Sequence, residues 1–265
     1  MKNAIIIKRV KEIRADMPRI GTRKLYFLLT DTLTQHDILI GRDRLFDLLA
    51  DYGMLVRKRK RRKVYTTDSN HPFRKYPNLI RELSVVHPNQ LWVSDITYIS
   101  LTGKFGYLSL VTDAYSRKIV GYCFYHTLEK EGPILALKMA LTGYQPSIPG
   151  MIHHSDRGLQ YCCADYISLL GSHRVLISMT EMGDPYENAI AERINGILKT
   201  EFELNKTFKT FEDAHDAIHR AILIYNEQRP HASCNYLTPS QAHQLQGALI
   251  AKWKKKKHVP SNPVE

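Results

Sequence analysis

Apolar residues recur every three or four positions along the first fifty residues of the chain. This spacing predicts helices over residues 5–16, from Thr22 onward and over residues 41–52, with Thr22 as the N-cap of the second helix. The first helix is expected to end before Pro18, and Gly53 suits the end of the third because glycine readily adopts the left-handed conformation found there. The chain therefore begins with a small bundle of three helices.

The middle of the chain is rich in the β-branched and aromatic residues that favour strands. Strands are expected over residues 90–100, 107–113 and 118–125, with a turn at Lys104-Phe105-Gly106, and together they give an antiparallel meander. Helices and strands then alternate, which places the chain in the α/β class. The expected order is a helix over 127–144, a short strand after Gly150, a helix over 161–171, a strand over 175–179, a helix over 184–205, and a helix capped by Thr210 that reaches Tyr225.

Basic residues are concentrated at the two ends of the chain. Its 265 residues carry 38 Lys+Arg and 26 Asp+Glu, a formal net charge of +12. Residues 1–66 hold 17 basic and 7 acidic residues, residues 251–265 hold five and one, and the part between them is close to neutral. Clustered basic segments favour a polyanion partner, most often nucleic acid. The densest segment is a run of seven basic residues: Arg57, Lys58, Arg59, Lys60, Arg61, Arg62 and Lys63.

The three predicted helices and the basic run together follow the plan of a small helix-turn-helix DNA-binding unit. Arg42 and Arg44 lie near the start of the third helix, and the run over residues 57–63 follows it as a basic arm. A purely structural three-helix bundle is the alternative. For the lysines near the C-terminus, a solubilising tail is an equal alternative to nucleic-acid binding.

Composition excludes several other classes of protein. With 43% hydrophobic residues the chain can bury a sizeable core, which disfavours global disorder. No apolar run approaches the ~20 residues that a membrane span needs, and the N-terminus does not read as a signal peptide. Four cysteines without a CxxC pair indicate neither a disulfide framework nor a zinc site. A reduced, cytoplasmic setting is expected.

Asp95 stands in the middle of the first predicted strand, within the sequence WVSDITY. Local propensity disfavours aspartate there, and such a conflict often marks a functional site. An aspartate on an edge strand that faces water is the alternative. Asp113, at the second turn of the meander, is interpreted as a turn residue and not as a ligand.

Two further carboxylates follow in the sequence. Asp156 comes just past the end of a short strand, where the sites of α/β folds tend to gather. Glu192 lies on a predicted helix, on which Glu192, Asn195 and Lys199 share one polar face at ~100° per residue. An ordinary solvated helix face is the alternative for these three residues.

Three carboxylates that converge in space are what two Mg²⁺ ions need, because magnesium prefers oxygen ligands and leaves room for phosphate oxygens. Two such ions stabilise the attacking and the leaving oxygen of a phosphoryl displacement. His153 and His154, just before Asp156, are weaker candidates for metal ligands, since a pair of histidines without further ligand spacing is a weak signal.

In these motifs the chain closely resembles the OrfB transposases of IS-three-type bacterial insertion sequences. These belong to the DDE superfamily, whose catalytic core is similar to retroviral integrase and ribonuclease H. The sequence WVSDITY carries Asp95, HSDRG carries Asp156 and ENAIAE ends at Glu192, with 35 residues between the last two carboxylates, the spacing that the family favours. Roughly residues 10–250 take part in the resemblance. Its further motifs are Lys199, seven positions after Glu192, the sequence YNEQRPH at 225–231 and Leu237-Thr238-Pro239.

The resemblance implies a ribonuclease H-like fold, a mixed five-stranded sheet with flanking helices preceded by a small all-α region. It implies that Asp95, on the central first strand, bridges two metal ions, while Asp156 and Glu192 each hold one. The expected ions are Mg²⁺, with Mn²⁺ as the alternative. Water and then a DNA 3′-hydroxyl would be the nucleophiles, without a covalent enzyme intermediate. The residues implied to contact DNA near the active site are Lys199 and, as weaker candidates, Asn188 and Asn195.

The resemblance also divides the chain and suggests its partners. Expected partners are double-stranded DNA at the element ends and the target, other copies of the chain on DNA, and the product of an upstream reading frame, either separate or fused to this chain. The expected parts are a helix-turn-helix-like DNA-binding region with its basic arm (1–64), a linker (65–86), an integrase catalytic core (87–205), a C-terminal helical extension of the core (206–250) and a basic tail (251–265).

The leading hypothesis is a metal-dependent transposase that cleaves and joins DNA strands during transposition of an insertion sequence. A non-catalytic DNA-binding regulator is one alternative, and the intact set of three carboxylates argues against it. A structure-directed nuclease with the same fold is another, for which strand joining would be absent. A location in the bacterial cytoplasm, in association with DNA, is expected in each case.

Overall fold

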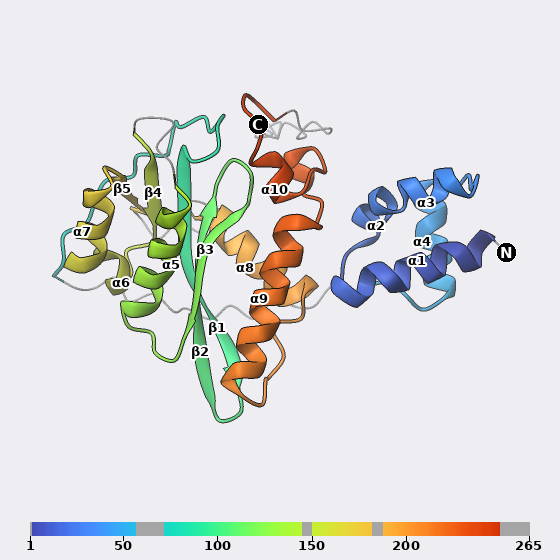
Figure 1. Cartoon of the computed structure of the whole chain (residues 1–265), viewed down its shortest axis with the longest axis horizontal. Helices are drawn as coiled ribbons and strands as arrows, with labels where there is room; N and C mark the ends of the chain where they lie inside the picture. The colour runs from blue at the N-terminus through green and yellow to red at the C-terminus, as the bar shows by residue number, and fades with distance from the viewer. Residues whose placement is uncertain (1, 57–71, 145–149, 182–187, 250–265) are drawn as a thin grey trace, which may run out of the picture.

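A computed structural model of the chain describes residues 2–56, 72–144, 150–181 and 188–249 (Figure 1). These residues form a small group of N-terminal helices and a larger α/β core. The predicted basic arm, residues 57–63, and the predicted basic tail, residues 251–265, lie outside the described residues. Within the described ranges, no helix combines the length and the apolar character that crossing a membrane requires.

The N-terminal group consists of α1 (Lys2–Asp16), α2 (Thr22–Leu28), α3 (Thr30–Gln35) and α4 (Arg42–Asp51). The second predicted helix is divided into α2 and α3, with Leu29 between them as the C-cap of one and the N-cap of the other. The prediction that Thr22 caps α2 is wrong. Gly21 occupies the N-cap with extended backbone, and Thr22 is the buried first residue of the helix. Gly53 follows α4 at φ +64°, the left-handed conformation expected of it.

The core is built on five strands: β1 (Leu91–Leu101), β2 (Lys104–Asp113), β3 (Ile119–Tyr125), β4 (Ile152–Ser155) and β5 (Leu176–Met179). Their order in the sheet is β3-β2-β1-β4-β5. The first three are antiparallel, whereas β4 and β5 join β1 in parallel. The predicted mixed five-stranded sheet, with the first strand at its centre, is therefore confirmed.

The first turn of the meander lies earlier than predicted. Leu101 pairs with Lys104, so the turn consists of Thr102 and Gly103, and the predicted turn residues 104–106 already belong to β2. Gly103 has φ +75°, a conformation that glycine adopts without steric cost. The glycine that allows the chain to reverse is thus Gly103 and not Gly106.

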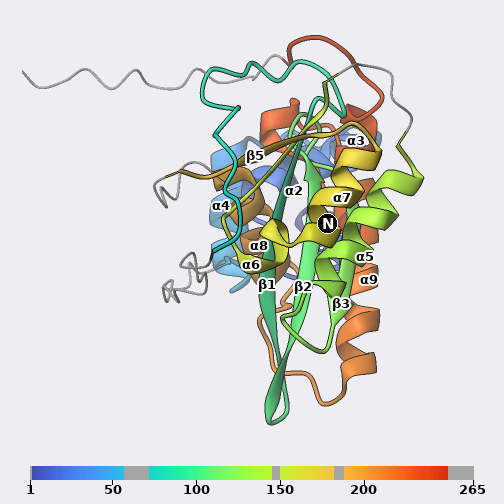
Figure 2. The same cartoon turned by 90° about the vertical axis from the view of Figure 1, so that its left-hand side faces the viewer.

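Helices cover both faces of the sheet (Figure 1). On one face lie α5 (Glu131–Thr142), α6 (Leu159–Cys162) and α7 (Ala164–Ser172), which face the viewer in Figure 2. On the other lie α8 (Ala189–Glu201) and α9 (Phe211–Glu227). The first face packs through Trp92, Leu137 and Tyr166, and the second through Ile99, Ile194 and other members of a larger apolar cluster. A 3-10 turn, η1 (Ala232–Cys234), and the short helix α10 (Pro239–Ala242) follow α9.

The helix predicted over 127–144 is α5, which is shorter at both ends, and two further helices also differ from the sequence pattern. The helix predicted over 161–171 is divided at Cys163, whose extended backbone separates α6 from α7. The helix predicted over 184–205 is α8, shorter at both ends, and the positions 184–187 lie outside the described residues. The predicted cap of α9 is confirmed, since Thr210 and Asp213 form a reciprocal capping box.

The described part of the predicted linker, residues 72–86, contains neither helix nor strand but packs against the core. Ile80, Leu83 and Val85 contact an apolar cluster at the β1–β4 side of the sheet. Leu79 donates its amide to Ser178 Oγ at 2.9 Å, beside β5. This segment therefore runs along the edge of the sheet next to β5.

The N-terminal helices pack on the far side of α9 from the sheet (Figure 1). Their apolar residues are continuous with the cluster that α8 and α9 form against the sheet. Arg220 of α9 pairs with Asp16 of α1 at 2.7 Å, and the Arg19 amide donates to the Glu201 carbonyl at 3.0 Å. The two parts of the molecule therefore share one packed interface.

Close packing between β3 and α5 gives the first prediction. A Cβ on Gly121 would come within 2.1 Å of the Ala136 carbonyl oxygen and 2.8 Å of the Ala140 amide nitrogen. Because these are backbone atoms, Gly121→Ala must push α5 away from the sheet, and we expect it to lower the free energy of unfolding by about 1–3 kcal/mol or more. Urea titration followed by circular dichroism measures this.

Gly171→Ala in α7 is the matched control, since a Cβ there meets nothing within 4 Å. We expect it to be neutral or to stabilise by up to about 1 kcal/mol, because alanine is the better helix former. Equal effects of the two substitutions would contradict the close approach of α5 to β3.

Candidate active site

Asp95 lies at the centre of β1, the middle strand of the sheet, and its side chain is half-buried. Its Oδ1 accepts a hydrogen bond from the Ile96 amide at 2.9 Å, and its Oδ2 accepts one from Asn195 Nδ2 at 2.8 Å. The alternative of an aspartate on an edge strand is therefore excluded. The carboxylate is held in place from β1 itself and from α8.

Asp156 follows the last residue of β4, directly beside β1. In the parallel register Leu91 pairs with Ile152 and Val93 with His154, so the same offset places Asp95 level with Asp156. Asp156 Oδ1 accepts the Gly158 amide at 3.0 Å, which fixes the turn into α6. The sheet register therefore brings the first two predicted carboxylates next to each other.

Electrostatics show the same proximity and extend it to Glu192. Burial and the negative charge of Asp156 raise the pKa of Asp95 from 3.8 to about 7, with a further contribution from Glu192. The hydrogen bonds from Asn195 and the Ile96 amide act in the opposite direction. Three carboxylates thus interact at this point of the sheet, and the charges of Asp156 and Glu192 both raise the pKa of Asp95.

The helix α8 supplies Glu192, Asn195 and Lys199. Glu192 is exposed in its first turn, whereas Asn195 is buried. Lys199 is half-buried, and its pKa is lowered by burial, although the charge of Asp95 acts to raise it. The predicted shared face of these residues is thus the side of α8 that borders β1.

Two asparagines dock α8 on β1, a role that the sequence did not indicate. Asn188, at the N-cap, donates a hydrogen bond from Nδ2 to the Ser94 carbonyl at 3.0 Å, and Asn195, about two turns further on, donates one to Asp95. Both side chains are buried, and within the part of the chain that the structure describes neither Oδ1 atom has a hydrogen-bond partner. Their predicted contact with DNA stays a prediction.

The two histidines before Asp156 belong to the protein interior. His153 Nε2 lies 2.8 Å from Ser94 Oγ and 2.9 Å from the Tyr166 hydroxyl, and burial lowers its pKa to about 3. His154 Nδ1 lies 2.8 Å from Ser178 Oγ. As neighbours on β4 they point to opposite faces of the sheet. The suggestion that the pair ligates a metal is therefore not supported.

Asp113 is confirmed as a turn residue. It is fully buried at the end of β2, where Oδ1 accepts the Ser116 amide at 2.7 Å and the Ser116 hydroxyl at 2.6 Å. Its Oδ2 accepts the Asn89 amide at 2.7 Å. This carboxylate anchors two loops at one end of the sheet.

Tyr161, on α6, is a neighbour of the site that sequence reasoning missed. Burial raises its pKa well above the usual value, and the charges of Asp95 and Asp156 contribute to the shift. Its hydroxyl is buried without a hydrogen-bond partner in the described residues. In the sequence, only its position could have indicated this: Tyr161 stands five positions after Asp156, in the short helix α6.

The helix α4, which carries Arg42 and Arg44, lies apart from β1, β4 and α8 (Figure 1). Arg42 and Arg44 are exposed at the start of α4. Arg42 pairs with Asp43 at 2.8 Å and Arg44 lies 3.9 Å from Asp47. The sheet and α8 therefore bring together the three carboxylates and Lys199, whereas the helix-turn-helix-like region presents a separate surface.

Whether these residues fit a metal can be judged from the donors. Among the described residues, no three His, Cys, Asp or Glu side chains stand close enough together to form a ready metal cage. The donors are nevertheless oxygen atoms of carboxylates, the type that Mg²⁺ prefers. The raised pKa of Asp95 shows negative charges that a cation would relieve. The donor set therefore fits a hard divalent ion.

A mixed five-stranded sheet with helices on both faces is a ribonuclease H-like fold, in which Asp95 lies on the central strand, Asp156 follows the adjacent parallel strand and Glu192 lies on α8, after β5. Sequence profiles of the integrase core domain match residues 85–185 and residues 173–239. A chain of the simian T-cell lymphotropic virus intasome, solved by cryo-electron microscopy with PP2A regulatory subunit B56 gamma, shares the fold. It is 17% identical, covers 96% of this chain and 80% of that one, and has a TM-score of 0.52.

Sequence relatives extend over most of the chain. The insertion element IS600 31 kDa protein of Shigella sonnei is 36% identical, with 83% of this chain and 79% of that protein covered. The transposase of insertion sequence element IS629 from the same species is 31% identical, with 87% of this chain and 75% of that protein covered. The putative transposase of IS986/IS6110 from Mycobacterium tuberculosis is 31% identical over 83% and 79%. The chain belongs to this family of insertion-sequence transposases, within the DDE and integrase superfamily. The hypothesis of a transposase is confirmed.

The raised pKa of Asp95 predicts a cost in stability. Between about pH 4 and pH 7 the unfolded chain loses the Asp95 proton while the folded chain retains it, so stability falls as the pH rises. Asp95→Asn removes this cost. In metal-free buffer we expect it to raise the free energy of unfolding near pH 8 by up to a few kcal/mol, on the order of 1.4 kcal/mol per pKa unit, and to change it little near pH 4. Urea unfolding at both pH values measures the difference.

Asp216→Asn is the control, because the Asp216 side chain is 87% exposed and should affect stability little at either pH. If Asp95→Asn destabilises the protein equally at both pH values, the surroundings of Asp95 do not raise its pKa.

Proposed function

We propose that Asp95, Asp156 and Glu192 are the catalytic carboxylates of this transposase and that they hold two divalent ions. The ions are Mg²⁺, with Mn²⁺ as the alternative. The observation that supports this assignment is the raised pKa of Asp95, a carboxyl on the central strand that interacts with the charges of both other residues. In this assignment all three carboxylates would act as ligands of the ions.

Bound ions supply charge neutralisation for the attacking and leaving oxygens of the phosphoryl displacement. The chain contributes position and charge. Asn195 keeps one Asp95 oxygen oriented, and the turn at Gly158 orients Asp156. Asp95 must be ionised to act as a ligand, so activity should require a pH or a cation that removes its proton. Catalysis then depends mainly on the alignment of groups and on electrostatic stabilisation.

Lys199 is the proposed contact to DNA beside the reacting end. It lies within range of the charge of Asp95, and its half-buried ammonium has lost part of its hydration. A phosphate of the DNA end is a suitable partner for such a group. Asn188 and Asn195 are weaker candidates, because their amides already dock α8.

DNA binding away from the active site is proposed for the helix-turn-helix-like region. The exposed Arg42 and Arg44 and the basic run over residues 57–63 would contact the phosphate backbone through salt-sensitive interactions. We also propose that the chain acts as an oligomer on the two element ends. The product of an upstream reading frame, separate or fused, would complete the recognition of those ends.

The three carboxylates carry the principal functional prediction. Asp95→Asn, Asp156→Asn and Glu192→Gln should each reduce strand transfer of a labelled element end to background, because each removes a charged ligand. Binding of the same DNA should remain close to wild type. Strand transfer is measured with and without Mg²⁺, and DNA binding by fluorescence anisotropy in the presence of Ca²⁺.

Asp165→Asn provides the matched control. Asp165 is an exposed carboxylate on α7 that pairs with Lys130, and its loss should leave strand transfer intact. Strand transfer that survives any one of the three active-site substitutions would refute the assignment of that residue.

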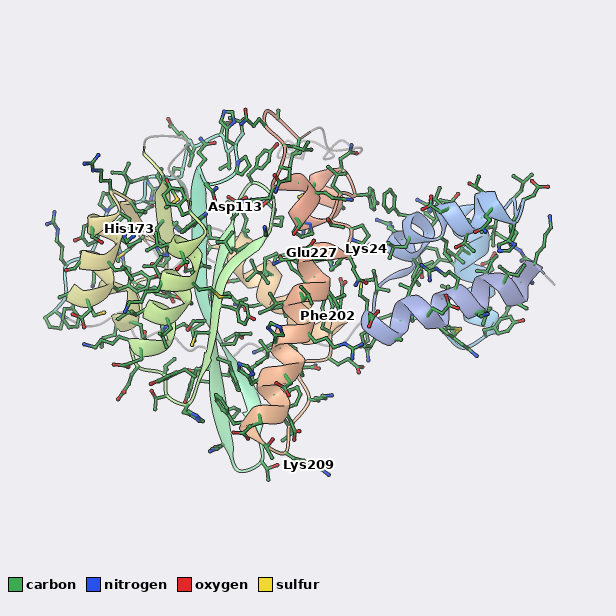
Figure 3. All side chains as sticks on the ribbon, in the orientation of Figure 1. Lys24, Asp113, His173, Phe202, Lys209 and Glu227 are labelled. Atoms are coloured by element: carbon green, nitrogen blue, oxygen red, sulfur yellow. The ribbon has the colours of Figure 1, made fainter. Side chains whose placement is uncertain are left out.

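A second prediction concerns Lys199. Lys199→Gln should weaken the binding of element ends and lower the slope of log K against log salt by about one unit, as expected when one phosphate contact is lost. Lys209→Gln is the control, since Lys209 is exposed at the far end of the molecule, before α9 (Figure 3). An unchanged salt slope in Lys199→Gln would exclude the phosphate contact.

A further inference from the structure

The motif YNEQRPH at residues 225–231 has contacts that explain three of its residues. The Tyr225 hydroxyl donates to the Arg117 carbonyl at 2.8 Å. The Asn226 side chain accepts the Ile119 amide and donates to the Ile119 carbonyl, both at 3.0 Å, and so takes the place of a neighbouring strand at the edge of β3. These two residues hold the end of α9 against the sheet.

Arg229 points in a different direction, toward the helix α8. Its Nε and Nη2 each donate to one oxygen of Glu201 at 2.9 Å, a bidentate pair. The Arg229 side chain is only 1% exposed, and its guanidinium also lies over the Tyr225 ring at 5.6 Å. A planar guanidinium bound in this way fixes both the position and the rotation of its partner.

Glu201 is the last residue of α8, two positions after Lys199. Its Oε1 also accepts Lys24 Nζ of α2 at 3.1 Å, and its carbonyl accepts the Arg19 amide at 3.0 Å. Figure 3 shows Lys24 at the boundary between the N-terminal helices and the core. Burial alone would raise the pKa of Glu201, but Arg229 and Lys24 outweigh it and the pKa is lowered. The carboxylate is therefore charged and shared between the two parts of the molecule.

The helix α8 is thus fixed along its whole length. Asn188 holds its start and Asn195 its middle on β1, while Arg229 holds its end from outside the sheet. Glu192 and Lys199 lie on the same helix, in which each residue advances by about 1.5 Å along the axis. A shift or rotation at Glu201 would therefore be transmitted to Glu192 and to the Asn195–Asp95 hydrogen bond.

We propose that Glu201 and Arg229 are positioning residues for the catalytic reaction, which set the placement of α8 and with it the alignment of the carboxylates. This inference rests on the proposed assignment of Asp95, Asp156 and Glu192. A buried ion pair contributes little net stability compared with apolar residues of similar size, so geometry is the main consequence of this pair. Lys24 extends the effect, because it ties the N-terminal helices to the same carboxylate.

The test compares Arg229→Gln, Arg229→Lys and Glu201→Gln with wild type. Arg229→Lys keeps the charge but loses the bidentate contact, so it provides a variant that folds if Arg229→Gln does not. For each variant the kcat and KM of strand transfer, the affinity for the element end, the unfolding temperature and the amide hydrogen exchange of α8 are measured. We expect kcat to fall about 10- to 100-fold, the effect of a small misplacement of reacting groups. KM and DNA affinity should stay near wild type, and exchange in α8 should accelerate without global unfolding.

Arg220→Gln is the matched control. The Arg220–Asp16 pair, at 2.7 Å, also joins the core to the N-terminal helices, but it does not touch α8 and is largely exposed. It should leave kcat and the exchange of α8 unchanged. A folded Arg229→Lys and Glu201→Gln with wild-type kcat, or the same loss of kcat in Arg220→Gln, would overturn the inference.

The comparison with Glu192→Gln separates this inference from the assignment of the active site. If Glu192→Gln abolishes strand transfer while both pair variants remain fully active, only the positioning role is wrong. If Glu192→Gln remains active, the catalytic assignment itself is wrong, and the positioning role falls with it.

Discussion

Asp95 places a half-buried carboxyl group on the central strand of the sheet, level with a second carboxylate. Burial and the charge of Asp156 together raise its pKa to about 7, which means that the ionised form is disfavoured and that a bound cation would stabilise it. The neighbouring elements are arranged around this constraint. Asn195 donates a hydrogen bond to the carboxylate, and Lys199 brings a positive charge into its range. The helix that supplies the third carboxylate is thus also the one that stabilises the first.

Two kinds of buried polar group stand in this sheet. The carboxylates at Asp95 repel one another, whereas other polar side chains are hydrogen-bonded and stabilise the fold. His153, Ser94 and Tyr166 form a neutral hydrogen-bonded cluster behind the strand, and Asp113 satisfies the amides of two loops at its end. Neither group needs a ligand to complete it. The carboxylates beside Asp95 differ, since their mutual repulsion is left for an ion to neutralise. Buried polar residues of similar chemistry therefore have opposite roles within one sheet.

The sequence predicted those parts of the site that follow from local rules. Asp95 conflicted with its strand and Asp156 followed a strand, and the parallel pairing of two adjacent strands was enough to bring them together. The docking role of Asn195 could not be predicted, because helical spacing gives the direction of a side chain but not the group that it meets. Arg229 and Glu201 were also missed as partners, since 28 residues separate them and only the packing of α9 against α8 joins them. The turn at Gly103 and the break at Cys163 depend on strand register and helix packing, which local pattern does not specify.

Several positive charges of the N-terminal helices are used in contacts within the protein. Residues 1–56 hold ten basic and seven acidic residues, so most of the positive charge of this end of the chain belongs to the run over residues 57–63. Several cations of the helices are paired within the protein, among them Arg42 with Asp43 and Lys24 with Glu201. Lys24 lies where the N-terminal helices meet the end of α8, and its charge pairs with Glu201 of that helix. The N-terminal helices and α9 therefore meet the end of α8 at one carboxylate, which both Lys24 and Arg229 contact.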